Sequence, residues 1–457
     1  MDRAKRMGEG SILRLLIAFS APAIVGMLAM AFYNVVDRSF VGHVVGPLGL
    51  AGTTVSFPFM LILMAFAMLV GIGSAALISI RLGQRKREEA EQVLGNAIIL
   101  LLLISAIITT LGLLFLDPIL RVLGASSEVL PYARQYLQII IAGSVFQGFA
   151  FGLNGIIRGE GNPRIAMITM LIGAIVNALL DALFLFYFGW GMRGAAAATV
   201  TAQGISALWV MGYFLSGHSL LRLRRGNFRL RRPVYLAIFA IGSPMFGMQM
   251  AGAVMNTILN NQLHVYGGDL SISVMGIIYA IAMFVAMPII GINQGAQPLI
   301  SYNFGACSFD RVMKTLLIAI GFASTICTTG FLVVMAFPTA VIGLFSRHDP
   351  ALVQLGTHAI RICLLMFPVI GFQIVGSGYF QAVGKPKHAL FLGLSRQVLI
   401  LIPAVIILPL FFGLNGIWAA IPTADSLSAL LTGTWLILEL RHLRRRHADT
   451  QNSAASC

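Results

Sequence analysis

The sequence predicts an all-α polytopic membrane protein with twelve transmembrane helices in two pseudo-symmetric six-helix bundles. Of its 457 residues, 58% are hydrophobic and only 10% are charged, and the mean hydropathy is +0.89, well outside the range of soluble globular proteins. Apolar runs of about 20 residues or more recur along the chain, each long enough to cross a hydrocarbon layer of ~30 Å. The expected spans are 14–41, 53–81, 93–116, 131–158, 164–188, 194–216, 234–262, 272–304, 312–338, 351–381, 388–412 and 415–440.

The net charge of +15 is explained mainly by membrane topology. An even number of spans places both termini on one side, and 25 of the 31 Lys and Arg residues fall on that side, against six on the other. The positive-inside rule therefore predicts a multi-pass protein of the plasma or inner membrane with both termini in the cytoplasm, and no nucleic-acid partner. The densest basic segment, RLRRGNFRLRR at 222–232, fits this topology signal, and contact with anionic membrane lipid is the alternative.

The second half of the chain repeats the first in one nearly gap-free register. In this register GEGNPR at 159–164 pairs with AVGKPK at 382–387, and GMRGAAAATVTA at 191–202 pairs with GLNGIWAAIPTA at 413–424. Single residues pair in the same register: Pro22 with Pro244, Asn34 with Asn256, Gly73 with Gly295 and Ser79 with Ser301. We therefore expect an N-terminal lobe at 1–216, a basic cytoplasmic linker at 217–233, and a C-terminal lobe with a basic tail at 234–457.

Two parallel lobes that can rock against each other indicate a transporter rather than an enzyme. The sequence has no DDxxD-like, HExxH or GxSxG arrangement, and its eight histidines do not cluster. We accordingly expect a monomer with no cofactor.

Ionisable residues inside membrane spans are rare and usually functional, so they locate the candidate site. Only three acidic residues lie well inside the predicted spans, and two of them, Asp37 and Asp181, lie at a similar depth of ~8–12 Å below the outer end of their helices. Thr199 lies at the same level on the next span. Tyr33 and Asn177 each precede a carboxylate by four residues and therefore share its helix face.

Helix-to-helix hydrogen bonding is the alternative interpretation of these polar side chains, and for Thr199 alone we would prefer it. It does not explain two carboxylates, because Asn or Ser could hold the helices together without the cost of a charge. The repeat strengthens the contrast: the counterparts of Asn177 and Asp181 fall near Leu399–Ala404, where LILIPA offers no polar side chain. The sequence therefore predicts an ion site in one half only.

The chain resembles the multidrug and toxic compound extrusion (MATE) transporters, in their prokaryotic branch. The resemblance covers essentially the whole chain and is carried by VVDRSFVG at the end of the first span, GEGNPR, NALLDALFLF and GMRGAAAAT. It implies efflux of cationic or amphipathic organic compounds, driven by re-entry of protons or sodium. It also implies a cation-coupling site at Asp37, Asn177, Asp181 and Thr199, a bend of the first helix at Pro22, and a further site residue at Asn154.

Two features depart from the family pattern. Arg38 follows Asp37 where a small uncharged residue is expected, and we predict that its side chain extends to the outer surface. Relatives with a second acidic site carry acids in the seventh and tenth helices. Here those helices offer Arg361 and four amides, Gln249, Asn256, Asn260 and Asn261. We expect Arg361 to form a structural ion pair with Asp425.

The favoured mechanism is proton-coupled antiport. Two carboxylates held together away from water repel each other and lose hydration, so such a pair can hold a proton near neutral pH. Protonation from outside would remove the attraction for a cationic drug and let the first helix bend at Pro22. Sodium bound by the same oxygen atoms is the first alternative. Flipping of a lipid-linked intermediate is the second, although it predicts a basic cleft that the N-terminal spans do not supply.

Overall fold

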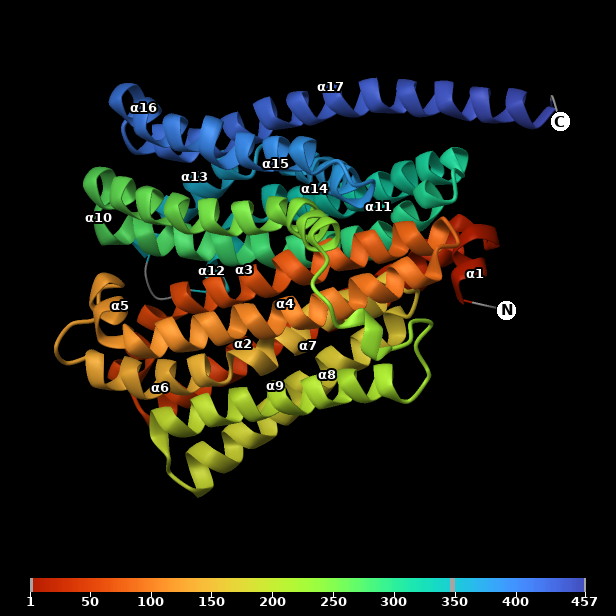
Figure 1. Ribbon diagram of the computed structural model, residues 1–457. Helices are drawn as coiled ribbons and strands as arrows, with labels where there is room; N and C mark the ends of the chain where they lie inside the picture. The colour runs from red at the N-terminus through yellow and green to blue at the C-terminus, as the bar shows by residue number, and fades with distance from the viewer. Residues whose placement is uncertain (1–2, 346–349, 456–457) are drawn as a thin grey trace. The chain divides into compact units, whose positions relative to one another are not determined.

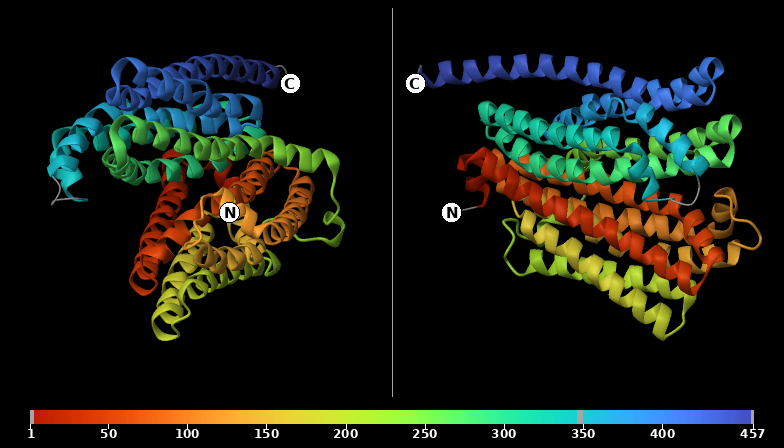
Figure 2. Two further views of the ribbon diagram at one scale, coloured as in Figure 1. Left: turned by 90° about the vertical axis from the view of Figure 1, so that its left-hand side faces the viewer. Right: turned by 180° about the vertical axis from the view of Figure 1, so that it is seen from behind.

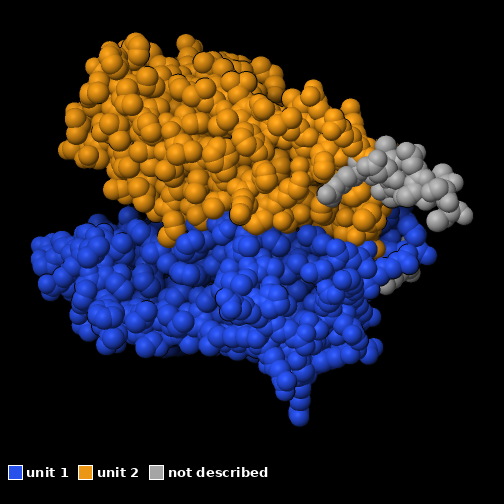
Figure 3. Space-filling model, turned by 45° about the horizontal axis from the view of Figure 1, so that its top comes forward, with its two compact units in different colours: residues 1–9, 25–246 blue, residues 10–24, 247–457 orange. Residues whose placement is uncertain are grey.

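The computed structural model describes residues 3–345 and 350–455, and for residues 3, 4 and 446–455 it describes the backbone alone. Packing divides the chain into two compact units (Figure 3). Unit 1 comprises residues 1–9 and 25–246, and unit 2 comprises residues 10–24 and 247–457. These units are defined by packing, whereas the expected lobes are defined by sequence repetition, so the expected boundaries at 216 and 233 stay a prediction.

All regular secondary structure among the described residues of unit 1 is helical (Figure 1). Long helices run alongside one another, and two further views show the same arrangement (Figure 2). Its elements are α1 (Arg3–Glu9), the larger part of α2 (Ile12–Val44), α3 (Pro47–Gly83), α4 (Arg87–Leu114), α5 (Leu116–Val122), α6 (Leu130–Ala142), α7 (Ser144–Gly159), α8 (Pro163–Asp181), the π-helix η1 (Ala182–Tyr187), α9 (Gly191–Leu215), the 3₁₀ turn η2 (Arg225–Asn227) and the first residues of α10 (Arg232–Gly305).

The regular secondary structure of unit 2 is likewise all helical in its described residues. It takes in the start of α2 and most of α10, and its other elements are α11 (Phe309–Ala336), α12 (Pro338–Gly343), α13 (Pro350–Cys363), α14 (Phe367–Ala382), α15 (Pro386–Leu394), the π-helix η3 (Ser395–Leu401), α16 (Ile402–Phe412) and α17 (Leu414–Ala455).

The helices are consistent with twelve membrane spans. Eight described helices are long and apolar enough to cross a membrane, and two bent pairs, α6 with α7 and α13 with α14, bring the number to ten. Helix α10 is 74 residues long and has non-helical backbone at Gly268, so it supplies two spans where one was counted. Helix α17, with 42 residues, covers the last predicted span.

Several boundaries differ from the sequence expectation. The predicted loop at 263–271 is helical except at Gly268, so the spans expected at 234–262 and 272–304 appear as one broken helix. The span expected at 131–158 bends by 55° at Gly143, and the span expected at 351–381 bends by 50° between Cys363 and Phe367. Hydropathy identifies each crossing but does not register a bend, because a bent helix stays apolar throughout.

The secondary structure repeats in the register of the sequence repeat. Helices α4 and α11 begin at Arg87 and Phe309, and the short helices α5 and α12 begin at Leu116 and Pro338, so the interval along the chain is the same for both pairs. Helices α8 and α15, and helices α9 and α17, begin at nearly that same interval. The two halves therefore share one order of elements, which confirms the predicted fold class.

Close helix crossings recur in this register as well. In unit 1, a Cβ placed on Gly71 of α3 would lie 2.8 Å from the backbone of Gly152 on α7, so only glycine permits this approach. The buried Ser79 hydroxyl donates a hydrogen bond of 2.6 Å to the Gly159 carbonyl across the same crossing. In unit 2 the counterpart, Ser301, donates a hydrogen bond of 2.7 Å to the Ala382 carbonyl.

Candidate functional site

The end of helix α2 supplies two of the predicted site residues. Tyr33 and Asp37 are four residues apart and so share one helix face. One turn further on, the Phe40 ring packs edge-on against the Phe186 ring of η1, with centroids 5.1 Å apart. This contact places the end of α2 against the segment that follows Asp181.

Helix α8 supplies the second pair, and its geometry changes at the carboxylate. Asn177 and Asp181 are both buried, Asp181 completely. The chain leaves α-helical geometry directly after Asp181 and continues as the π-helix η1. Such π segments are rare inside helices and often occur at functional sites.

Thr199 of α9 connects to this pair through Asn177. The Asn177 amide donates a long hydrogen bond, 3.4 Å, to the Thr199 hydroxyl, and that hydroxyl donates to the Ala195 carbonyl at 3.1 Å. Thr199 is therefore held between its own helix and α8, with its oxygen directed toward the site.

The two carboxylates face each other. The carboxyl groups of Asp37 and Asp181 are close enough to interact as a hydrogen-bonded pair, and Tyr33 lies near both. Two ionised carboxylates have no proton to share, so this approach becomes a hydrogen bond only when one of them is protonated. The geometry is that of a carboxylate dyad.

Four buried oxygen atoms at this site have no hydrogen-bond partner among the described residues. They are Asp37 Oδ1, Asn177 Oδ1, Asp181 Oδ1 and Asp181 Oδ2. Buried polar atoms are nearly always paired in proteins, so an unpaired cluster of acceptors calls for an explanation. Acceptor oxygens grouped in this way can hold a proton or a small cation.

The structure adds Tyr136 of α6, which the sequence analysis missed. Tyr136 is almost fully buried, lies close to both carboxylates and to Thr199, and directs its hydroxyl to the Met60 sulfur at 3.9 Å. A signal was available, because a tyrosine inside an apolar span needs a polar partner. No short-range spacing connected it to Asp37, since it comes from a different helix.

Asn154 and Pro22 are not part of this cluster. Asn154 of α7 donates to the Ala166 carbonyl at 2.8 Å and accepts a hydrogen bond of 2.9 Å from Arg158. Its described partners are therefore structural. Pro22 lies inside α2, fifteen residues before Asp37, where the missing N–H interrupts the helix hydrogen bonding.

Arg38 does not pair with Asp37. Its exposed guanidinium lies over the ring of Phe57 on α3, 5.4 Å from the ring centroid, in a cation–π contact. No ion pair between Arg38 and Asp37 is found in the part of the chain that the structure describes.

Unit 2 holds a different buried pair, and here the sequence expectation is wrong. Asp425 of α17 accepts a hydrogen bond of 2.7 Å from Arg396 Nε in η3, whereas Arg361 is exposed. Counting residues from the helix ends placed Arg361 and Asp425 at a similar depth in the membrane. A similar depth does not show that the two helices are neighbours. Helix α17 packs against η3, which brings Arg396 to Asp425.

The arrangement in unit 1 suits ion binding rather than covalent chemistry. Within the described residues, no three His, Cys, Asp or Glu side chains are grouped so as to hold a metal ion. Any cation larger than a proton would therefore have to be held by the two carboxylates together with amide and hydroxyl oxygens, as at Asn177 and Thr199.

Comparisons with known proteins agree with this architecture. The MatE family model matches residues 22–183 and again residues 244–407, so the two matches begin at the paired prolines Pro22 and Pro244. The multidrug export protein MepA of Staphylococcus haemolyticus (strain JCSC1435) is 28% identical over 436 residues, which cover 95% of each chain.

Two solved structures are similar over nearly the whole chain. The MATE multidrug transporter DinF-BH in complex with R6G is 42% identical with a TM-score of 0.88, covering 94% of this chain and 96% of that one. A crystal structure of MATE in the bent conformation is 25% identical with a TM-score of 0.92, covering 98% and 99%.

The fold and the repeated helices define a polytopic membrane transporter, not an enzyme. The chain belongs to the MatE family of multidrug efflux transporters, whose model matches most of its length in two copies.

Proposed function

We propose that this transporter exports cationic or amphipathic organic compounds in exchange for protons, and that Asp37 and Asp181 carry the exchanged proton. The observation that carries the proposal is the carboxylate dyad, in which Asp181 is buried and Asp37 is half-buried, with its unpaired oxygen atoms and its neighbours Asn177 and Thr199. The similarity to a multidrug export protein and to a multidrug transporter in complex with R6G supports the substrate class.

The dyad couples the two fluxes through its charge. When both carboxylates are ionised, their negative charge in a low-dielectric bundle attracts a cationic compound. When a proton binds, one charge disappears and the carboxyl groups can share a hydrogen bond, so the attraction for the drug falls. A membrane potential adds about 2.3 kcal/mol per 100 mV to the inward movement of each proton.

Pro22 gives helix α2 a point at which protonation could change its path. The helix continues through Pro22, but the hydrogen bond that the proline nitrogen cannot donate makes this turn easier to bend. The solved bent conformation of a related MATE protein supports a bending step. In this proposal the charge state of Asp37, on the same helix, selects between the straight and bent forms.

Sodium exchange at the same oxygen atoms is the alternative. The four unpaired oxygens and the Thr199 hydroxyl form a set of hard ligands of the kind that alkali cations accept. Protons and sodium can therefore be separated only by imposing each gradient alone. The distribution of basic residues further supports a location in the plasma or inner membrane with both termini in the cytoplasm.

The test is transport of R6G in proteoliposomes that contain the full-length protein, with a proton gradient, a sodium gradient or neither. We expect the proton gradient to drive R6G movement, and Asp37→Asn and Asp181→Asn each to reduce the driven component by about tenfold or more. Asp117→Asn is the matched control, because Asp117 is an acidic residue of unit 1 that pairs with Arg134 at 3.4 Å and is not a member of the dyad.

The competing outcomes are distinct. If a sodium gradient alone drives R6G movement fully, sodium rather than the proton is the coupling ion at this site. Undiminished proton-driven transport in both site variants would refute a role for the dyad.

A further inference from the structure

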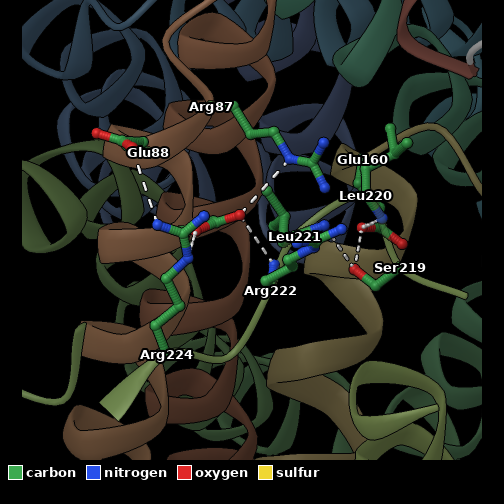
Figure 4. A network of polar contacts seen from close by, with 9 residues as sticks. Arg87, Glu88, Glu160, Ser219, Leu220, Leu221, Arg222 and Arg224 are labelled. Carbon is green, nitrogen blue, oxygen red and sulfur yellow. Dashed lines mark hydrogen bonds and ion pairs between the residues drawn. The ribbon is translucent and has the colours of Figure 1, made fainter. Parts of the chain in front are cut away.

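The linker between α9 and α10, residues 216–231, is held against the rest of unit 1 by two buried carboxylates (Figure 4). It appears as the yellow-green segment between these helices in Figure 1. Glu160, from the motif GEGNPR, is completely buried and accepts hydrogen bonds from the Tyr213 hydroxyl, from the Ser219 hydroxyl at 2.5 Å and from the Leu220 amide at 3.1 Å. Leu221 is buried directly after these contacts.

The second carboxylate, Glu91 of α4, holds the next part of the linker. It accepts a hydrogen bond of 3.2 Å from the Arg222 amide and forms ion pairs with Arg224 at 3.3 Å and with Arg87 at 3.5 Å. Further along, the Arg231 amide donates to Asn96 Oδ1 at 2.9 Å. Backbone groups at three positions are therefore bound by buried or partly buried side chains, which fixes the shape of the segment between them.

A close approach fixes the middle of the linker. A Cβ on Gly95 of α4 would lie 2.3 Å from the carbonyl oxygen of Asn227, so the η2 turn rests directly on the helix backbone. Only glycine at position 95 allows this contact.

The linker has a basic surface formed by arginine side chains that do not pair with other described residues. Arg225, Arg229 and Arg232 are exposed and have no ion-pair or hydrogen-bond partner for their side chains among the described residues. Phe228 and Leu230 lie between them, with 40% and 44% of their surfaces exposed. We call these five residues the linker patch.

The nearby acidic residues cannot neutralise the patch, because other basic groups already engage them. Glu88 pairs with Arg224, and Glu89 pairs with Arg81 and Lys86. Glu91 is occupied as described above. The patch therefore carries a net positive charge beside two exposed apolar side chains, at the ends of helices that cross the membrane.

We propose that the linker patch binds the headgroups of anionic phospholipids in the surrounding bilayer. Guanidinium groups bind phosphate oxygens in bidentate fashion, and interleaved apolar side chains can enter the interfacial region beside them. A role in topology alone needs the charges but not a fixed backbone. The buried anchors and the Gly95 contact are what a docking surface needs, because they hold the three arginines in place before lipid binds.

The experiment measures lipid binding to the full-length transporter in neutral detergent, titrated with phosphatidylglycerol or with phosphatidylcholine. Bound lipid is counted by native mass spectrometry, and the thermal midpoint is followed in parallel. We expect phosphatidylglycerol to bind and stabilise, phosphatidylcholine to do neither, and binding to weaken as salt rises. The triple variant Arg225→Gln, Arg229→Gln, Arg232→Gln should bind phosphatidylglycerol at least about tenfold more weakly, because each basic residue near an anionic surface contributes about fivefold.

Two controls make the proposal falsifiable. The variant Arg441→Gln, Arg444→Gln, Arg445→Gln removes the same charge from exposed positions on α17 and should leave the affinity within about twofold, because these residues are not part of the linker patch. Gly95→Ala keeps every charge but displaces the η2 turn, and should weaken binding severalfold while a purely topological role would be unaffected. Equal losses in the two triple variants, unchanged binding in Gly95→Ala, or equal stabilisation by inorganic phosphate would each overturn a lipid-docking patch.

Discussion

Burial of the Asp181 carboxylate at this position lowers the stability of the fold. Both of its carboxylate oxygens are buried without a hydrogen-bond partner among the described residues, and a second carboxylate faces it. Leaving a buried polar atom unpaired costs about 1–3 kcal/mol, and more when the group is charged. Asparagine at positions 37 and 181 should therefore stabilise the fold while it abolishes proton exchange, so loss of transport in these variants cannot be attributed to unfolding.

Tyr136 offers a sharper test of how the dyad is supported. Its hydroxyl lies near Thr199 and both carboxylates, and Phe would keep the packing of α6 while removing that single group. We expect Tyr136→Phe to lower proton-driven R6G transport by about threefold to tenfold, the equivalent of one hydrogen bond. The rate is measured in the same proteoliposomes at equal protein content.

Tyr132 provides the matched control on the same helix. It lies one turn before Tyr136, is partly buried, and packs against the apolar core of unit 1. Tyr132→Phe should leave the transport rate within about twofold, because the Tyr132 hydroxyl has no hydrogen-bond partner among the residues that the structure describes. Similar losses in both variants would assign the effect to helix packing and not to the site.

At the scale of elements, hydropathy predicted where the chain crosses the membrane but not how each helix is shaped. The bend at Gly143 and the π-helix after Asp181 leave the apolar composition unchanged, so the hydropathy pattern did not predict them. The site residues of α2, α8 and α9 could be predicted because they lie at a matching depth, and those of α2 and α8 also share a helix face with a second polar residue. Tyr136 and Arg396 could not, because their roles depend on which helices are neighbours.

The pair of hydrogen bonds made by Ser79 and Ser301 gives an element-scale prediction. Each hydroxyl is buried and bonds a carbonyl on a neighbouring helix, at corresponding positions of the two halves. We expect Ser79→Ala and Ser301→Ala each to lower the free energy of unfolding by about 1 kcal/mol, with similar values because the geometry is similar. Chemical or thermal unfolding in detergent measures both.

Ser74 supplies the comparison. It is equally buried on the same helix as Ser79, but its hydroxyl has no hydrogen-bond partner among the described residues. Ser74→Ala should therefore be neutral or slightly stabilising. If Ser74→Ala lowers the free energy of unfolding as much as Ser79→Ala does, then the packing around the side chain, and not the interhelical hydrogen bond, determines the loss of stability.

At the scale of the whole molecule, the two halves share an order of elements but not their buried charges. The N-terminal half places two carboxylates together without an ion-pair partner among the described residues, whereas the C-terminal half pairs Asp425 with Arg396 at 2.7 Å. The difference coincides with the π-helices, because η1 follows Asp181 while η3 contains Arg396 and lies at a different point of the repeat. One half is thus suited to gain and lose a charge, and the other to keep its charges balanced.

This asymmetry predicts opposite effects of the same substitution in the two halves. Asp425→Asn leaves the Arg396 guanidinium uncompensated and should destabilise the protein by about 2 kcal/mol. This is less than the ~3–5 kcal/mol of a fully buried pair, because 31% of the Arg396 side chain is exposed. The folded fraction should still couple R6G movement to the proton gradient. Asp181→Asn should have the opposite effect, because it removes coupling to the proton gradient without lowering the stability.

Combining Asp425→Leu with Arg396→Met removes both charges and should recover the stability, measured as the thermal midpoint in detergent. If Asp425→Asn instead abolishes coupling at full stability, the C-terminal half takes part in ion exchange and the division of roles proposed for the two halves is wrong.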